Sequence, residues 1–287
     1  MKYALFLGCT VPVRALNYEI STRKVADKLG IELVDINDFN CCGFPVKSVD
    51  RDTFLLMAAK NLSLAEEKGL DICCLCSACC SVLTEVNKEL KEDEELRKKV
   101  NKELSIVGRK YEGKIKVKHF ARILYEDVGI DKIRENIKVG LSKFKLAAHY
   151  GCHYLKPSEI YEGFDDPENP KTLDELIEVT GAKSVPYKDK LGCCGGGILG
   201  IDEMTALKVA KNKLDHIKAA KADAICLICP FCSIMYEGSQ KKIEKQFETE
   251  YKLPVFYYPQ ILGLALGIPQ EELGLKMNRI KPREMLA

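Results

Sequence analysis

The sequence predicts an α/β protein of two tandem, pseudo-symmetric repeats, each with a mostly parallel, Rossmann-like βαβ sheet. Three observations carry this prediction. Short apolar runs alternate with longer amphipathic segments, the same landmarks occur twice in the same order, and cysteines follow the apolar runs. The chain has 287 residues, of which 46% are hydrophobic and 30% charged, which suits one large or two small packed domains.

Short apolar runs, most of them rich in β-branched or aromatic residues, are typical of buried strands. They lie at residues 2–7, 32–36, 71–75 and 115–120 in the first repeat and at 145–150, 183–187, 224–228 and 255–258 in the second. Between them, residues 53–68 and 203–220 have the apolar spacing of helices that would cover a parallel sheet. The charged stretch 83–110 predicts a helix with a solvated face.

The two repeats are recognised by landmarks that recur in order. A Gly-Cys pair ends the first apolar run of each half, a Cys-Cys-Gly triplet follows the second, and a CxxC follows the third. The landmarks are Cys9, Cys41-Cys42-Gly43 and Cys76-x2-Cys79, then Cys152, Cys193-Cys194-Gly195 and Cys229-x2-Cys232. We expect a first module at 1–140 and a second at 141–287.

Composition excludes several classes of protein. With 44 basic and 42 acidic residues the net charge is +2, without the basic excess of a nucleic-acid-binding protein. The longest apolar run, 261–268, is too short to span a membrane. No secretory signal is apparent, so the 14 cysteines indicate a cytoplasmic protein that keeps its thiols for metal rather than a disulfide framework.

All three cysteine groups of a repeat follow predicted strands. Parallel α/β sheets place ligands at the carboxyl ends of their strands, so we expect five thiols to converge in each repeat. Sulfur donors select zinc or iron–sulfur clusters, and five exceed the four that one zinc ion needs. A cluster with more than four protein bonds is therefore favoured.

Other patterns fit less well. Cys73, Cys76 and Cys79 begin like a bacterial ferredoxin motif, as do Cys226, Cys229 and Cys232, but the required fourth cysteine is replaced by Leu83 and by Tyr236. We interpret Cys73, Cys74 and Cys226 as buried thiols, and Cys80, matched by Ser233, as a non-ligand. Gly195 to Gly200 fits GxGxxG, yet it follows cysteines rather than a strand. Its glycines are expected to let the backbone approach a cluster and begin a helix.

The doubled Cys…CCG…CxxC pattern resembles the CCG superfamily, and in particular the catalytic B subunits of the soluble heterodisulfide reductases of methanogenic archaea. The resemblance spans nearly the whole chain. It implies two noncubane [4Fe-4S] clusters, each held by five cysteines. Carried over onto this sequence, the ligands are Cys9, Cys41, Cys42, Cys76 and Cys79 for one cluster and Cys152, Cys193, Cys194, Cys229 and Cys232 for the other.

The resemblance also implies an activity, the reduction of the mixed disulfide of coenzyme M and coenzyme B to two thiols, the last step of methane formation. His153 is our candidate proton donor. Because the substrate carries sulfonate, carboxylate and phosphate groups, we expect cations in its pocket. Arg14, Lys47 and Lys156 are the candidates; Lys188 and Lys190 also lie near the motifs.

The implied partners are a small C-type subunit with cubane clusters and a flavin-containing, electron-bifurcating A-type subunit linked to a hydrogenase or formate dehydrogenase. The implied enzyme class is a CoB–CoM heterodisulfide reductase of the dihydromethanophenazine or ferredoxin type. Two alternatives stay open. One is an iron–sulfur electron-transfer subunit of a glycolate- or lactate-type oxidoreductase, since such subunits carry the same modules. The other is a zinc-binding scaffold, since four thiolates of either module could hold zinc.

Overall fold

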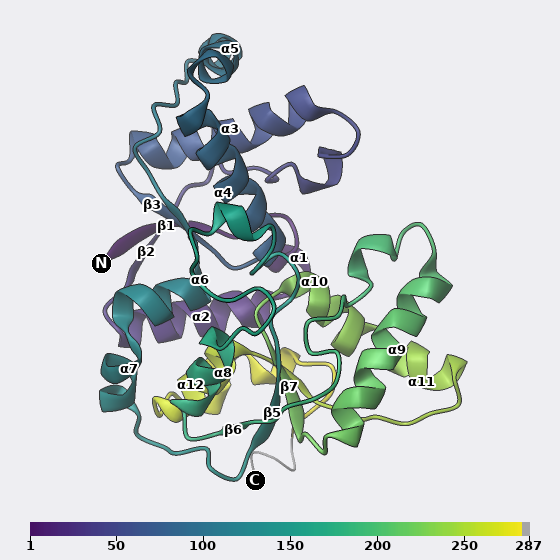
Figure 1. Ribbon diagram of the computed structural model, residues 1–287. Coiled ribbons are helices and arrows are strands. Elements are labelled where there is room, and N and C mark those ends of the chain that lie inside the picture. The colour runs from purple at the N-terminus through teal and green to yellow at the C-terminus, as the bar shows by residue number, and fades with distance from the viewer. Residues whose placement is uncertain (283–287) are drawn as a thin grey trace.

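A computed structural model, which describes residues 1–282, confirms the two α/β repeats (Figure 1). Each sheet has four parallel strands. The first, in the order β2-β1-β3-β4, consists of β1 (Lys2–Phe6), β2 (Glu32–Asp35), β3 (Asp71–Cys74) and β4 (Val117–His119). The second, in the order β6-β5-β7-β8, consists of β5 (Lys145–His149), β6 (Lys183–Ser184), β7 (Ala224–Leu227) and β8 (Val255–Tyr257).

Every predicted strand is present, and the largest differences are at β4 and β6, each three residues shorter than predicted. The sequence predicts a strand over 183–187, but pairing with β5 ends at Ser184. Pro186 has no backbone N–H to donate, so the ladder cannot continue through it. Beyond the proline, the Tyr187 hydroxyl donates to the carbonyl of Ala148 at 2.8 Å, which keeps the segment against the sheet.

Helices flank both sheets and follow the predicted order. In the first module they are α1 (Val11–Arg14), α2 (Leu16–Lys28), α3 (Arg51–Glu67), α4 (Ser77–Glu92), α5 (Glu94–Leu104), α6 (Phe120–Arg122) and α7 (Ile130–Asn136). In the second they are α8 (Thr172–Glu178), α9 (Glu203–Ala219), α10 (Pro230–Ser233), α11 (Gln240–Gln246) and α12 (Tyr258–Ala265). Among residues 1–282, no helix is both long and apolar enough to cross a bilayer.

The charged stretch 83–110 differs from its prediction. Asp93 ends α4 and its carboxylate accepts the Leu96 N–H at 2.9 Å, so it caps a separate helix, α5. The helix α4 also buries Leu83, Val86 and Leu90, so it has an apolar face as well as a solvated one. The helical character and the solvated face of this stretch are therefore confirmed, whereas the break at Asp93 and the apolar face of α4 were not predicted.

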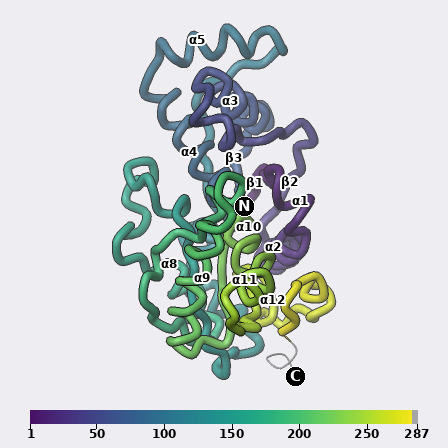
Figure 2. Tube along the Cα trace, turned by 90° about the vertical axis from the view of Figure 1, so that its right-hand side faces the viewer, coloured from purple at the N-terminus to yellow at the C-terminus, as the bar shows by residue number. Residues whose placement is uncertain are grey.

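The two modules pack through α2 and α12, which lie side by side (Figure 2). The Tyr18 and Tyr257 rings stack there with centroids 4.1 Å apart. Asn278, 1% exposed, accepts from the side chains of Asn17 (3.0 Å) and Gln260 (2.9 Å) and donates to the carbonyl of Val255 (2.8 Å). One amide thus joins the first module, α12, β8 and the last described segment.

The Cys-Cys-Gly turns depend on their glycines. Gly43 and Gly195 have φ of 94° and 83°, in the left-handed region that residues with a Cβ adopt at a cost. A Cβ at Gly195 would lie 2.7 Å from the carbonyl oxygen of Ala206 in α9, whereas one at Gly43 would lie 3.3 Å from that of Phe54 in α3. The turn is therefore packed directly onto the helix that follows it.

We predict that Gly195→Ala lowers the free energy of unfolding by about 3 kcal/mol, because it adds left-handed strain and a backbone clash. Gly197→Ala is the matched control, since its Cβ would meet no atom within 4 Å, and it should change stability by less than about 0.5 kcal/mol. Denaturant unfolding of both variants measures the difference. Equal stability of the two would contradict the packing described above.

Asn278→Ala should lower the free energy of unfolding by about 2 kcal/mol, because three buried polar groups lose their partner. Lys276→Ala, at an exposed neighbour, should change it by less than about 0.5 kcal/mol. Thermal unfolding followed by circular dichroism compares the two. An Asn278→Ala protein as stable as the control would show that the modules are joined elsewhere.

Candidate metal centre

The sheet topology brings the predicted cysteines to one edge of each module. In the order β2-β1-β3-β4 the path of the chain across the sheet reverses between β1 and β3, and a crevice opens beyond the carboxyl ends of these two strands. Cys9 follows β1 and Cys76 follows β3, immediately before α4. The second sheet repeats this arrangement, with Cys152 after β5 and Cys229 after β7.

Burial divides the five thiols of each module into an inner and an outer group. The second cysteine of the CCG triplet and both CxxC cysteines are buried, namely Cys42, Cys76, Cys79, Cys194, Cys229 and Cys232. The outer cysteines are reachable from solvent: Cys9, Cys152 and Cys193 are exposed and Cys41 is half-buried. All of them are free thiols. We call the group of five thiols in each module its recess; its inner thiols are shielded from solvent and its outer thiols lie at or near the surface.

The inner thiols contact one another within each module. Cys42 hydrogen-bonds with Cys41 and Cys79, and Cys79 also contacts Cys76. In the second module Cys194 hydrogen-bonds with Cys193 and Cys232, and Cys232 with Cys229. Of the remaining pair, Cys9 lies close enough to Cys41, and Cys152 close enough to Cys194, to interact electrostatically.

The two recesses meet. The thiols of Cys76 and Cys229 lie close enough to share a hydrogen bond, so the CxxC turns of the two modules adjoin each other across the module interface. The structure therefore brings all ten predicted cysteines into one continuous group of thiols. Within residues 1–282, no three Cys, His, Asp or Glu side chains are arranged to hold a single metal ion.

Hydrogen bonds among these sulfurs shift the pKa values of the two CCG cysteines in the same way in both modules, whereas the pKa of Cys76 is raised and that of its counterpart Cys229 is lowered. Hydrogen bonds from Cys41 and Cys79 lower the pKa of Cys42 to about 4, and those from Cys193 and Cys232 lower the pKa of Cys194. The pKa of Cys41 and of Cys193 is raised, mainly because each donates to this neighbour. Within each triplet the hydrogen bonds therefore favour the thiolate form, which binds metal, at the inner cysteine.

The backbone around the thiols suits a bulky sulfur-bound group. The amides of Gly195 and Gly196 donate to the sulfurs of Cys193 and Cys194, each at 3.3 Å. A Cβ at Gly8 would lie 2.9 Å from the sulfur of Cys79, and one at Gly151 would lie 3.5 Å from that of Cys232. Only glycine lets the chain come this close at Gly8, whereas the distance at Gly151 is an ordinary van der Waals contact. An all-sulfur donor set with N–H donors to sulfur fits an iron–sulfur cluster in each recess.

The four other cysteines lie where the sequence analysis expected them. Cys73, Cys74 and Cys226 are buried within β3 and β7. Cys80, on α4, hydrogen-bonds with Cys74 and approaches the Thr84 hydroxyl at 4.0 Å. The segment 196–198 forms one 3-10 turn after the left-handed Gly195, which agrees with glycines that begin a helical turn beside the thiols.

His153 lies between the modules. Its ring meets the ring of Phe44, from the first CCG loop, edge to face with centroids 5.0 Å apart. Burial lowers its pKa, with a further decrease from Lys47. Its Nδ1 is buried and has no hydrogen-bond partner among the described residues. The predicted proton donor therefore faces the first module from the loop that carries Cys152.

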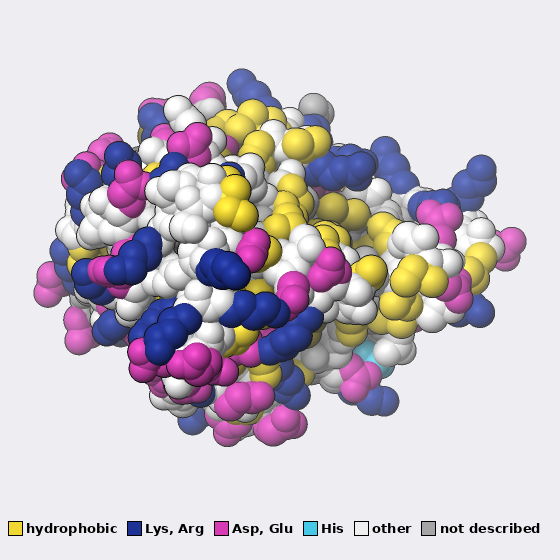
Figure 3. Space-filling model, turned by 90° about the horizontal axis from the view of Figure 1, so that it is seen from above, with side chains coloured by type: hydrophobic (Ala, Val, Ile, Leu, Met, Phe, Trp, Pro, Cys, Tyr) yellow, Lys and Arg dark blue, Asp and Glu magenta, His cyan; other side chains and the backbone are white. Residues whose placement is uncertain are grey.

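The three predicted substrate cations have different partners. Lys47 acts electrostatically on His153 and forms an ion pair with Glu85 at 2.5 Å. Arg14 lines a hollow that it shares with residues of the second module, among them Glu237. Lys156 pairs with Glu168 at 3.0 Å. Seen from above, Lys and Arg side chains lie beside Asp and Glu, with hydrophobic side chains between the groups (Figure 3).

Two side chains that the sequence analysis did not single out hold the second CxxC turn in place. The Nδ1 of His119 accepts the Ala121 N–H at 3.1 Å, so its Nε2 carries the proton and donates to the carbonyl of Ile228 at 3.0 Å. The hydroxyl of Tyr18 donates to the same carbonyl at 3.1 Å. Both belong to the first module, and only the packing of the modules brings them to Cys229.

Lys213 was also missed. It lies on α9, is 2% exposed, and donates from Nζ to the carbonyls of Lys190 (2.9 Å) and Gly192 (2.7 Å), directly before Cys193. Burial lowers its pKa to about 8. A comparison of the two repeats could have found it, because the matching residue of α3, Asn61, donates to the carbonyl of Cys41 at 3.1 Å.

Comparisons with known proteins agree with this geometry. The cysteine-rich domain model named CCG matches twice, at residues 3–84 and 146–237. The heterodisulfide reductase B subunit of Methanosarcina acetivorans that is named ferredoxin- and F420H2-dependent is 39% identical over all of this chain and 96% of its own length. The 8-methylmenaquinol:fumarate reductase membrane anchor subunit of Wolinella succinogenes is 33% identical over 97% of each chain.

More distant matches extend this picture. Proteins of Methanocaldococcus jannaschii and Methanococcus maripaludis that are named iron–sulfur proteins match 93% of this chain but only 47% of their own length. A crystal structure of a hypothetical protein from Helicobacter pylori superposes with a TM-score of 0.77 at 18% identity, over 98% of this chain and 52% of that one, and shows the fold alone. By its doubled domain and its full-length relatives, this chain belongs to the cysteine-rich CCG domain family and, within it, to the heterodisulfide reductase B subunits.

Proposed function

We propose that this protein is the catalytic subunit of a heterodisulfide reductase that reduces the mixed disulfide of coenzyme M and coenzyme B to two thiols. The observation that carries the proposal is the contact between Cys76 and Cys229, through which the sulfur-lined recesses of the two modules meet. Cleavage of an unsymmetrical disulfide yields two thiolates, and two adjacent recesses provide one binding site for each.

In this proposal each module holds one noncubane [4Fe-4S] cluster through its five cysteines. The ligands are Cys9, Cys41, Cys42, Cys76 and Cys79 in the first and Cys152, Cys193, Cys194, Cys229 and Cys232 in the second. Such clusters supply single electrons and an iron site that takes up a thiolate sulfur. The buried Cys42 and Cys194 would hold the cluster from the interior of each module, and the outer cysteines would hold it at the surface.

The protein side chains bind the substrate and supply protons. Reduction of the disulfide takes up two electrons and two protons, and His153, whose ring contacts Phe44 of the other module, is our candidate to deliver a proton. Lys47, which acts electrostatically on His153, is the first candidate to bind an anionic group of the substrate, followed by Arg14 and Lys156. Burial of the inner thiols keeps water from the point where the recesses meet.

The electron source lies outside this chain. We propose a complex with a small C-type subunit carrying cubane clusters and a flavin-containing A-type subunit, served by a hydrogenase or formate dehydrogenase in the cytoplasm. The relative from Methanosarcina acetivorans, whose name includes ferredoxin and F420H2, supports the complex but suggests a different donor. Purification of the native complex would distinguish these donors.

A second function is favoured by one specific observation. The relative from Wolinella succinogenes belongs to a fumarate reductase, so the same modules occur in an enzyme that acts on an organic acid. In that function the two modules pass electrons and no disulfide is cleaved. An electron paramagnetic resonance spectrum of oxidised protein separates the two, since only the disulfide-cleaving function predicts a signal that depends on added coenzyme M thiol.

The anaerobically purified chain should contain about eight irons and eight acid-labile sulfides, as two four-iron clusters require. It should reduce the mixed disulfide with a reduced viologen as the donor. Stoichiometric zinc with little sulfide would instead support the scaffold function. Iron and sulfide without turnover, and without a signal dependent on coenzyme M thiol, would favour the organic-acid oxidoreductase.

Cys193→Ser should lower turnover of the mixed disulfide at least about 100-fold and reduce the iron content, because a hydroxyl is a poor replacement for a cluster thiolate. Cys80→Ser is the matched control, since Ser233 already occupies this position in the second module. It should keep full iron content and turnover. Equal activity of the two variants would remove Cys193 from the site.

A further inference from the structure

The two recesses have the same arrangement of five cysteines but differ in the residues that lie behind those cysteines. Asp50 caps α3 and Asp202 caps α9 in the same way, each accepting the N–H of the third residue after it at 3.0 Å. Asn61 and Lys213 lie at the same distance beyond these caps. A neutral amide in the first module therefore takes the place of an ammonium group in the second.

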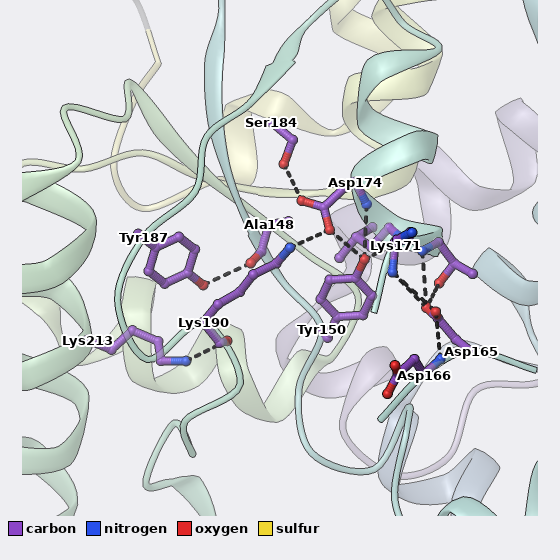
Figure 4. Close-up of polar contacts among 12 residues, drawn as sticks. Ala148, Tyr150, Asp165, Asp166, Lys171, Asp174, Ser184, Tyr187, Lys190 and Lys213 are labelled. Carbon is purple, nitrogen blue, oxygen red and sulfur yellow. Dashed lines mark hydrogen bonds and ion pairs between the residues drawn. The ribbon is translucent and has the colours of Figure 1, made fainter. Parts of the chain in front are cut away.

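Lys213 carries its charge deep in the second module. The side chain runs from α9 to the carbonyl of Lys190 (Figure 4), and Gly192 accepts its other hydrogen bond. Within residues 1–282 it has no ion pair; Asp189, the nearest acid to act on it, is instead 3.2 Å from His216. The thiols of Cys232, Cys194 and Cys193 are close enough to interact electrostatically with it.

Two further substitutions make the second module more polar. His149 takes the place of Phe6, three residues before the Gly-Cys cysteine, and Tyr236 that of Leu83, four residues after CxxC. The rings of His149 and Tyr236 meet edge to face with centroids 4.8 Å apart, and His149 interacts electrostatically with Cys194. Both are buried, with ring nitrogens and hydroxyl lacking partners among the described residues.

The cation near the first recess, Lys47, differs from Lys213 in its exposure and its pairing. Lys47 is exposed and paired with Glu85, so water and the carboxylate screen its charge. A buried ammonium acts through a medium of lower dielectric and reaches further. Since a reduced cluster is one charge more negative than an oxidised one, a nearby fixed cation favours the reduced form.

We propose that Lys213 makes the cluster of the second module the one with the higher reduction potential, so that the first electron delivered to the protein comes to rest there. Lys213 is in this sense a positioning residue, because it acts on the cluster through space and touches no thiol. The inference rests on the proposed function in requiring a cluster in each module. It assigns the two modules different roles, with the first passing electrons and the second storing them.

The test is a redox titration of the anaerobically purified holoprotein, followed by electron paramagnetic resonance. The signals of the two clusters are assigned with Cys41→Ser and Cys193→Ser. In the wild type, the signal of the second module should change at the higher potential. At a fixed potential near its midpoint, Lys213→Asn should lower the ratio of reduced to oxidised cluster in the second module about tenfold, with the first module unchanged. Lys213→Arg should restore the wild-type ratio.

Asn61→Lys is the reciprocal variant and should raise the ratio for the first module. It keeps the test decisive if Lys213→Asn loses its cluster, and unfolding curves of both variants separate a folding defect from an electrostatic effect. Full iron content with unchanged potentials in both variants, or a lower potential at the second module of the wild type, would overturn the inference. A wild-type protein without iron and sulfide would instead overturn the proposed function.

Discussion

The contact between the two CxxC turns is the constraint on which the rest of the structure depends. Cys76 and Cys229 begin α4 and α10 in different modules, yet their thiols touch. Holding two sulfur-rich turns against each other requires that both sheets present their carboxyl ends to a common axis. The α2–α12 packing, the stacked tyrosines and the Asn278 network all maintain that orientation.

Side chains of the first module also hold the CxxC turn of the second module in position. Two donors, the ring of His119 and the hydroxyl of Tyr18, bind the carbonyl of Ile228 one residue before Cys229. Displacing this buried carbonyl would cost free energy, because two buried donors would each lose their hydrogen-bond partner. The position of a thiol in one module is thus determined by side chains of the other, and the site belongs to the whole chain.

The sequence predicted the features that occur in both repeats, but it did not predict the contacts between the two modules. Strand positions, the order of the cysteine groups and the edge at which they converge follow from periodicity and from the rules of parallel sheets, and each repeat reports them independently. The contact of Cys76 with Cys229 and the hydrogen bond of His119 to Ile228 depend on how two folded units dock. No local pattern records that docking, which rests on single side chains such as Asn278.

Duplication explains both the similarity and the difference of the modules. The sulfurs, their glycines and the helix caps have the same form in both copies because cluster binding constrains their geometry closely. The residues that lie behind the sulfurs are less constrained, because the CCG loop needs only a hydrogen-bond donor there. The amide of Asn61 supplies that donor in the first module, and the ammonium group of Lys213 supplies it in the second. Both copies thus keep a side-chain donor to this loop, at the carbonyl of Cys41 in the first module and at that of Gly192 in the second, while the charge is free to differ. A buried charge costs stability that the amide would not, so its presence beside only one recess is better explained by its effect on the site than by the fold.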